Sequence, residues 1–197
     1  MVIGPGLGRC PIVCEATAQI IRYAKKQKLA MVLDADALWM LSQPEYRDLF
    51  EGYDDAPVVL TPNVVEYKRL KENLSEAQLE SVTIVRKGNN DAIIHKGKEA
   101  MECHEVGGKK RSGGIGDVLA GALGTLVAWN RILNKETARE DMPLACWTAC
   151  CFVKHATLLA YNDKKRSMTA PDVLEHLGPA INGMTGEEEV PNPMSNL

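Results

Sequence analysis

Several features that would mark other classes of protein are missing from this sequence of 197 residues. The formal net charge is only −3, which gives no electrostatic case for binding nucleic acid or an anionic membrane. The N-terminus, MVIGPGLGRC, has neither the basic nor the apolar segment of a signal peptide. The longest apolar stretch, 144–161, is interrupted by Lys154 and His155, so we expect a buried core helix there and not a membrane span. These absences predict a cytoplasmic protein.

The six cysteines lack the spacing of a metal site. No C-x-x-C pair occurs, and Cys150 and Cys151 are neighbours inside a helical pattern. Structural zinc is therefore disfavoured, and we expect reduced, mostly buried thiols in a reducing compartment. The identity of any residue that ligates a metal stays open.

Short apolar runs typical of strands alternate with helical patterns along the chain, which predicts an α/β protein with a largely parallel sheet. Strands are expected at 1–3, 31–35 and 57–61 and in two runs that flank the turn at 88–90; helices are expected at 11–26, from 36, from 64, at 116–130, at 142–161 and from 171. The helix at 11–26 shows its periodicity in Val13, Ala16, Ile20, Ile21 and Ala24. With no repeat and no linker, we expect one domain over 1–183 and a flexible tail over 184–197.

Two stretches near the N-terminus follow expected strands, where parallel sheets bind ligands. In GPGLGR (4–9), glycines allow a ligand to approach the backbone beside a helix N-terminus, although a tight turn explains the stretch as well. In LDAD (33–36), Asp34 and Asp36 suit a magnesium ion held through water, or a hydroxyl group. The alternative is that Asp36 caps the helix that follows.

Asn63 and Glu66 lie where the strand at 57–61 gives way to a helix. Their spacing is that of a capping box with asparagine in place of serine, and this alone is a sufficient structural reason for both. Directed into a cleft, the same pair could hold a ribose, an amide or a hydrated metal.

The strongest chemical signal is RSGGIGD (111–117). Glycine at the start of a helix costs stability, so Gly113, Gly114 and Gly116 predict backbone N–H groups that converge on a phosphate. The stretch is not a P-loop, because no Gly-Lys-Ser/Thr sequence closes it. Asp117 is either an N-cap or the base that takes a proton from a hydroxyl group attacking a γ-phosphate.

Five stretches occur in the order VIGPGLGR, VLDADALW, LTPNVVEYKRL, RKGNND and GGKKRSGGIGDVLAGALGTLVAW. In this order they resemble the ATP- or ADP-dependent NAD(P)H-hydrate dehydratases of the ribokinase-like superfamily, over residues 2–178. The resemblance implies a three-layer α/β fold with a mostly parallel central sheet flanked by helices. It also implies repair of (6S)-hydrated NADH or NADPH: the nucleotide phosphorylates the ring hydroxyl, and phosphate is then eliminated.

The resemblance assigns residues to three roles. Asp117 would be the catalytic base, and Mg²⁺ would accompany the phosphates of ATP or ADP. The hydrated dinucleotide would contact Asp117 and a further set: Gly6, Asn63, Val64, Val65, Glu66, Tyr67, Lys68 and Arg69. The nucleotide would contact Lys87, Gly88, Asn89, Asn90, Asp91, Gly107, Gly108, Lys109, Lys110, Arg111, Ser112, Gly113, Gly114, Ile115 and Gly116.

The chain departs from the family pattern at its N-terminus. Family members carry further early strands and glycine-rich segments that line the substrate pocket, so we expect these N-terminal strands, and any targeting segment with them, to be missing here. Two alternatives therefore stay open: a small-molecule kinase of the superfamily that acts on a vitamin-precursor alcohol, and an inactive truncated form that still binds nucleotide. Because ribokinase-like proteins often associate, a homo-oligomer is compatible with the resemblance.

Overall fold

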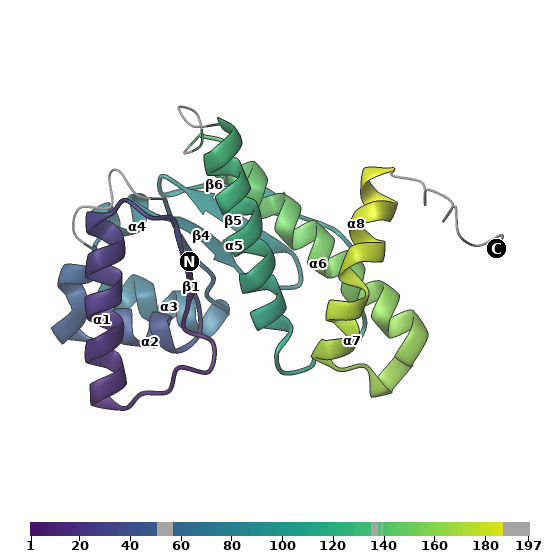
Figure 1. Cartoon of the computed structure of the whole chain (residues 1–197), viewed down its shortest axis with the longest axis horizontal. Coiled ribbons are helices and arrows are strands. Elements are labelled where there is room, and N and C mark those ends of the chain that lie inside the picture. Colours follow the sequence, from purple (N-terminus) through teal and green to yellow (C-terminus); the bar gives the residue numbers. More distant parts are fainter. Residues whose placement is uncertain (51–56, 135–137, 139, 187–197) are drawn as a thin grey trace, which may run out of the picture.

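A six-stranded sheet forms the centre of the protein in the computed structural model, which describes residues 1–50, 57–134, 138 and 140–186 (Figure 1). Its strands are β1 (Val2–Ile3), β2 (Met31–Leu33), β3 (Val58–Leu60), β4 (Thr83–Arg86), β5 (Asp91–His95) and β6 (Lys98–Cys103). They lie in sequence order; β1 to β4 run parallel, whereas β4, β5 and β6 pair antiparallel. The sheet is mostly parallel, as predicted.

Helices cover both faces of the sheet. They are α1 (Pro11–Lys26), α2 (Asp36–Leu41), α3 (Val64–Asn73), α4 (Glu76–Glu80), α5 (Ile115–Asn134), α6 (Met142–Lys164), α7 (Ala170–Glu175) and α8 (Leu177–Thr185), with 3-10 turns η1 (Pro44–Phe50) and η2 (Lys165–Ser167). Leu33 and Leu60 pack with α1, α2 and α3, while their neighbours Val32 and Val59 pack with α5 and α6. Because successive side chains of a strand point to opposite faces, the sheet separates two cores, which is the expected three-layer arrangement.

Helix α1 has the predicted bounds, and one of its faces is buried. Its buried residues are Cys14, Thr17, Ala18, Ile21 and Ala24, whereas Ile20 is 47% exposed. The apolar residues of this segment occupy two faces of the helix, and only one can lie on the sheet. Of the residues that show the helical periodicity, Ile21 and Ala24 lie on the buried face and Ile20 lies outside it.

Strand β6 and helices α4 and α8 were not predicted. The residues of β6, KEAMEC, are mostly exposed and only Cys103 is fully buried, so its own pattern is weak. The strand forms because β5 supplies its hydrogen-bonding partner, and because the indole Nε1 of Trp147 on α6 donates to the Glu102 carbonyl at 3.1 Å. Helix α8 extends to Thr185, and residues 187–197 of the predicted tail lie outside the described residues.

Helix α6 is a core helix, as its sequence predicted. Residues 142–167 are long and apolar enough to cross a membrane, and no other helix in the described ranges meets that test. Yet α6 contributes buried residues to two core clusters and packs against β5, β6, α5 and α8. Five of the six cysteines are buried, three of them on α6, and all six are free, which confirms the expectation of mostly buried thiols.

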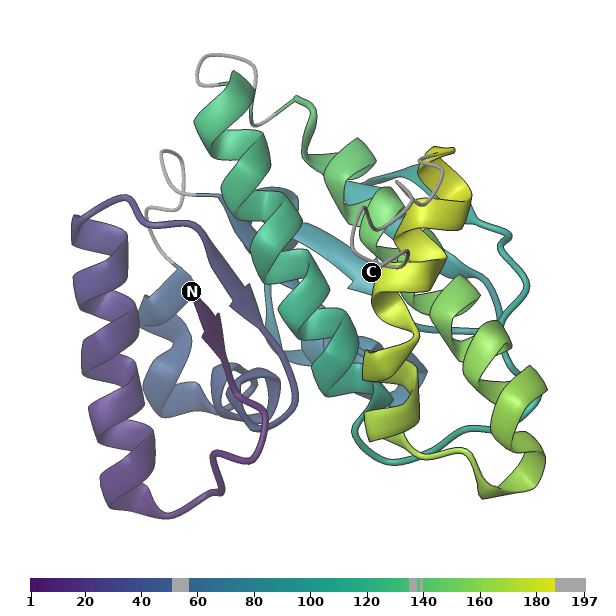
Figure 2. The ribbon, with the colours of Figure 1, turned by 45° about the vertical axis from the view of Figure 1, so that its right-hand side comes forward.

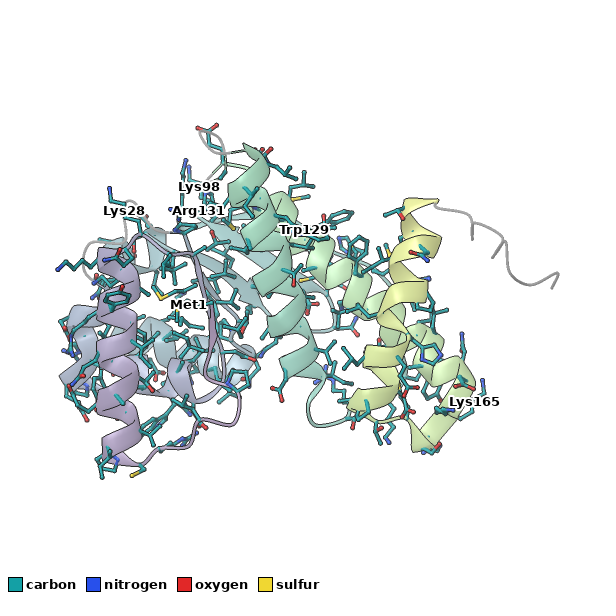
Figure 3. The ribbon with its side chains drawn as sticks, in the orientation of Figure 1. Met1, Lys28, Lys98, Trp129, Arg131 and Lys165 are labelled. Carbon is teal, nitrogen blue, oxygen red and sulfur yellow. The ribbon has the colours of Figure 1, made fainter. Side chains whose placement is uncertain are left out.

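Strand β1 lies at one edge of the sheet, between α1 and α5 (Figures 1 and 2). It is held by its pairing with β2, and the Met1 ammonium donates to the Ala30 carbonyl at 2.8 Å. Figure 3 shows Met1 between the two helices and Trp129 on α5, where Trp129 is 58% exposed. Val2 packs closely on α5, since a Cβ on Gly124 would lie 2.6 Å from Val2 Cγ2.

Replacing Ile21 with alanine should lower the free energy of unfolding by about 2–5 kcal/mol, because this fully buried side chain faces the sheet. Ile20→Ala is the matched control on the same helix and should change it by less than about 0.5 kcal/mol. Denaturant unfolding monitored by circular dichroism measures both, and equal losses would contradict the observed face of α1.

Candidate active site

A cavity of about 530 Å³ opens at the carboxyl ends of the parallel strands. Asp34 follows β2, Asn63 follows β3 and Lys87 follows β4, and all three line it. Asn63 and Lys87 form an isolated parallel bridge, in which the Lys87 N–H donates to the Pro62 carbonyl at 2.8 Å. This is the location at which open α/β sheets bind their ligands.

The N-terminus of α5 forms one wall of the cavity. Residues Gly113 to Gly116 line it, and the helix begins at Ile115. Gly114 has a φ of +89°, and a Cβ there would lie 2.9 Å from the Cβ of Ala170, so the turn requires glycine. Although the Asp117 N–H donates to the Gly114 carbonyl at 3.0 Å, the positive end of the helix dipole makes this end suited to an anion. Asp117 lies in the first turn, exposed, and lines the same cavity.

The capping box at the start of α3 is formed and also lines the cavity. Asn63 Oδ1 accepts from the N–H groups of Val65 and Glu66 at 2.9 Å, and Glu66 Oε2 accepts from the Asn63 N–H at 2.8 Å. The structural interpretation of this pair is thus confirmed. The box also fixes both side chains at the cavity wall, so capping and ligand binding are compatible here.

The loop after β4 (residues 87–90) is held in place by the side chains of Asp91 and Lys154. Asp91 Oδ1 accepts from the Gly88 N–H at 2.8 Å, and Asp91 Oδ2 lies 3.6 Å from Lys154 Nζ, which also donates to the Asn89 carbonyl. Burial raises the pKa of the Asp91 carboxyl, although the Gly88 N–H and the Lys154 charge oppose that shift. Asp91 therefore fixes the conformation of the loop after β4, and it also lines the cavity.

The two carboxylates of LDAD have different partners. Asp34 is buried and accepts from Lys87 Nζ at 2.7 Å. Asp36 Oδ2 accepts from the Gly8 N–H and its Oδ1 from Arg9 Nε, both at 3.0 Å. The N-cap of α2 is Ala35, so the interpretation of Asp36 as that cap was wrong: its carboxylate instead ties the GPGLGR turn to α2.

Helix α6 supplies a wall that the sequence analysis missed: Cys150, Val153, Lys154 and Thr157, with Leu119 of α5 beside them. Burial raises the pKa of the Cys150 thiol well above its ordinary value, so this residue is a packing group and not a nucleophile. Thr157 Oγ1 accepts from the Gly108 N–H at 2.9 Å. The sequence feature that could have identified this wall is the pair Lys154 and Thr157, two polar residues at helical spacing in an otherwise apolar helix.

Most of the predicted site residues line this one cavity. They are Asn63, Glu66 and Asp117 of the substrate set and, of the nucleotide set, residues 87–89, 91, 107–108 and 110–116. Val64, Tyr67, Lys68 and Asn90 line an adjoining cavity of about 490 Å³, which shares Lys87 and Gly88 with the first. Gly6, Val65, Arg69 and Lys109 line neither cavity, and Lys110 directs its ammonium to the Met168 carbonyl at 2.6 Å.

Comparison with known proteins assigns the chain to a family. The profile of the NAD(P)H-hydrate dehydratase family matches residues 1–179. The chain belongs to this family. The ATP-dependent (S)-NAD(P)H-hydrate dehydratase of Schizosaccharomyces pombe is 38% identical over 212 residues, which cover 98% of this chain and 63% of that protein.

A second family member, the ATP-dependent (S)-NAD(P)H-hydrate dehydratase of Entamoeba histolytica, is 34% identical and matches 96% of this chain and 65% of its own length. The chain thus spans just under two thirds of these relatives. The ADP/ATP-dependent NAD(P)H-hydrate dehydratase of Bacillus subtilis, co-crystallised with ATP/Mg²⁺, has the same fold, with a TM-score of 0.64 at 22% identity over 92% of this chain and 63% of that one.

Replacing Gly114 with alanine should destabilise the protein by about 1–3 kcal/mol, because an alanine is strained at φ +89° and meets Ala170. Gly113→Ala is the matched control, since a Cβ there would meet nothing within 4 Å. Melting temperatures with and without ATP measure both variants, and we expect the increase that ATP produces to be smaller for Gly114→Ala. Identical behaviour of the two variants would show that the loop does not need its observed conformation.

Proposed function

We propose that this protein regenerates NADH and NADPH from their (6S)-hydrated forms, in a reaction that consumes ATP or ADP. The observation that carries the proposal is the convergence of Asp117, the glycine turn and the Asn63–Glu66 box on one cavity. Membership of the NAD(P)H-hydrate dehydratase family and the activity named for its relatives support the same reaction.

In the proposed reaction, Asp117 is the general base. It takes the proton of the ring hydroxyl, whose oxygen then attacks the terminal phosphoryl group, so that an O–P bond forms as the bond to the leaving nucleotide breaks. In the second stage the ring C–O bond breaks, phosphate leaves, and loss of a proton from the neighbouring ring carbon restores the double bond. The exposure of Asp117 toward the cavity allows a substrate hydroxyl to reach it.

The remaining groups that line the cavity would bind the negatively charged phosphate groups of the nucleotide. The N–H groups at the start of α5 and the ammonium of Lys87 are donors for the phosphoryl oxygens, and Arg111 lines the cavity next to them. Negative charge that develops on the transferring phosphoryl group would be stabilised by donors that are already in place. The dinucleotide would extend from the Asn63–Glu66 box along α3, where Tyr67 and Lys68 line the adjoining cavity.

Mg²⁺ fits this donor set as a companion of the nucleotide phosphates. Among the residues that the structure describes, no group of three or more His, Cys, Asp or Glu side chains could hold a metal by itself. Magnesium in nucleotide sites uses one or two carboxylates together with phosphate oxygens and water, and Glu66 could supply such a carboxylate. When bound, Mg²⁺ would neutralise phosphate charge during transfer.

The direct test is incubation of the chain with hydrated NADH, Mg²⁺ and either ATP or ADP. We expect the NADH absorbance band to return, and the relative rates identify the preferred nucleotide. If no NADH appears while ATP still raises the melting temperature, the protein binds nucleotide without acting as a dehydratase.

Asp117→Asn tests the assigned base. It should lower kcat by about 10²–10⁴-fold with little change in ATP affinity, because the amide keeps the shape of the side chain but cannot accept the hydroxyl proton. Asp163→Asn, which changes a half-exposed carboxylate at the far end of α6, is the matched control and should leave the rate unchanged. A rate within about threefold of that of the unaltered chain would show that Asp117 is not the base.

A further inference from the structure

The ion pair between Asp34 and Lys87 is one of two largely buried ion pairs that line the cavity. Lys87 Nζ lies 2.7 Å from Asp34 Oδ1, and the Asp34 side chain is 2% exposed while that of Lys87 is 23% exposed. The pair joins the ends of β2 and β4 across the sheet. A lysine ammonium has three donors, and this contact uses one of them.

Both side chains lie against the glycine turn of α5. A Cβ built on Gly116 would be 3.6 Å from Lys87 Nζ and 3.7 Å from Asp34 Oδ2. The ammonium is therefore adjacent to the helix N-terminus that attracts an anion, and it is fixed there by a carboxylate that water scarcely reaches.

The second buried pair of the cavity has a different arrangement. Lys154 Nζ lies 3.6 Å from Asp91 Oδ2 and also donates to the Asn89 carbonyl, so its donors serve the loop after β4. Lys87 makes no such second contact among the interactions found in the described residues, and it lines both cavities. The Asp91–Lys154 pair therefore fixes the loop after β4, whereas the Asp34–Lys87 pair presents an ammonium group to the cavity.

We propose that Asp34 is a positioning residue for phosphoryl transfer: it holds the Lys87 ammonium at the N-terminus of α5, where the transferred phosphoryl group binds. This role rests on the proposed function for its chemistry. Asp34 acts through Lys87, and it limits the positive charge of the site, because the pair together is neutral.

This arrangement predicts opposite effects for the two partners. Lys87→Met leaves the Asp34 carboxylate unpaired beside the phosphate site, where it repels the nucleotide, so ATP affinity should fall by at least about tenfold. Adding Asp34→Asn to that variant removes the repelling charge, and ATP affinity should recover by at least about fivefold. Titration calorimetry with ATP and Mg²⁺ measures these affinities without any need for turnover.

Asp34→Asn alone should separate binding from catalysis. The unpaired Lys87 charge still attracts phosphate, so the dissociation constant for ATP should stay the same or decrease, while kcat falls by about tenfold or more because the ammonium is no longer held in place. Lys87→Arg keeps the charge and should retain more activity than Lys87→Met. Asp48→Asn, which breaks the exposed pair with Arg22, is the control and should change neither quantity.

Two results would overturn the proposal. One is equal ATP affinity of Lys87→Met and the double variant; the other is a parallel loss of ATP affinity, kcat and melting temperature in Asp34→Asn, which is what a purely structural residue would show. An unaltered chain that binds ATP but forms no NADH would contradict the proposed function, and the binding measurements would still decide the role of Asp34.

Discussion

Because β1, β2, β3 and β4 all run in one direction, the segments that follow them emerge at one edge of the sheet. The strands pair in the register Leu33 with Leu60 and Leu60 with Ile84, so the residues after them become neighbours. The N-terminus of α5 reaches the same edge, although α5 packs on the face of the sheet opposite to α1, α2 and α3. The groups that follow β2, β3 and β4 become neighbours only through this parallel pairing.

The cavity combines donors for phosphate with carboxylates, and two of these carboxylates are paired with lysines. Asp34, which follows β2, and Asp91, which begins β5, each have a lysine partner. Asp117, in contrast, is exposed in the first turn of α5. A carboxylate there is favoured by the helix dipole, yet it remains accessible to a substrate hydroxyl. The proposed site therefore combines groups that attract an anion with an accessible carboxylate.

Much of the local structure could be predicted from the sequence, because its causes lie within a few residues. The bounds of α1, the capping box of α3 and the glycine start of α5 follow from helical periodicity, side-chain capping and backbone freedom. The order of these motifs also identified the family. Strand β6 could not be predicted, since its residues form a strand only when β5 is there to pair with them.

The sequence by itself therefore determined most of the helices and strands, the family and the residue types that the chemistry needs. Only the tertiary structure decided their partners: Asp34 binds Lys87, Asp36 binds Arg9, and the α6 residues from Cys150 to Thr157 close the cavity. The physical reason is the separation along the chain of the residues that interact. Helix periodicity, caps and glycine turns act between near neighbours in the chain, whereas these contacts join residues brought together by strand register and by the packing of helices on two faces of a sheet.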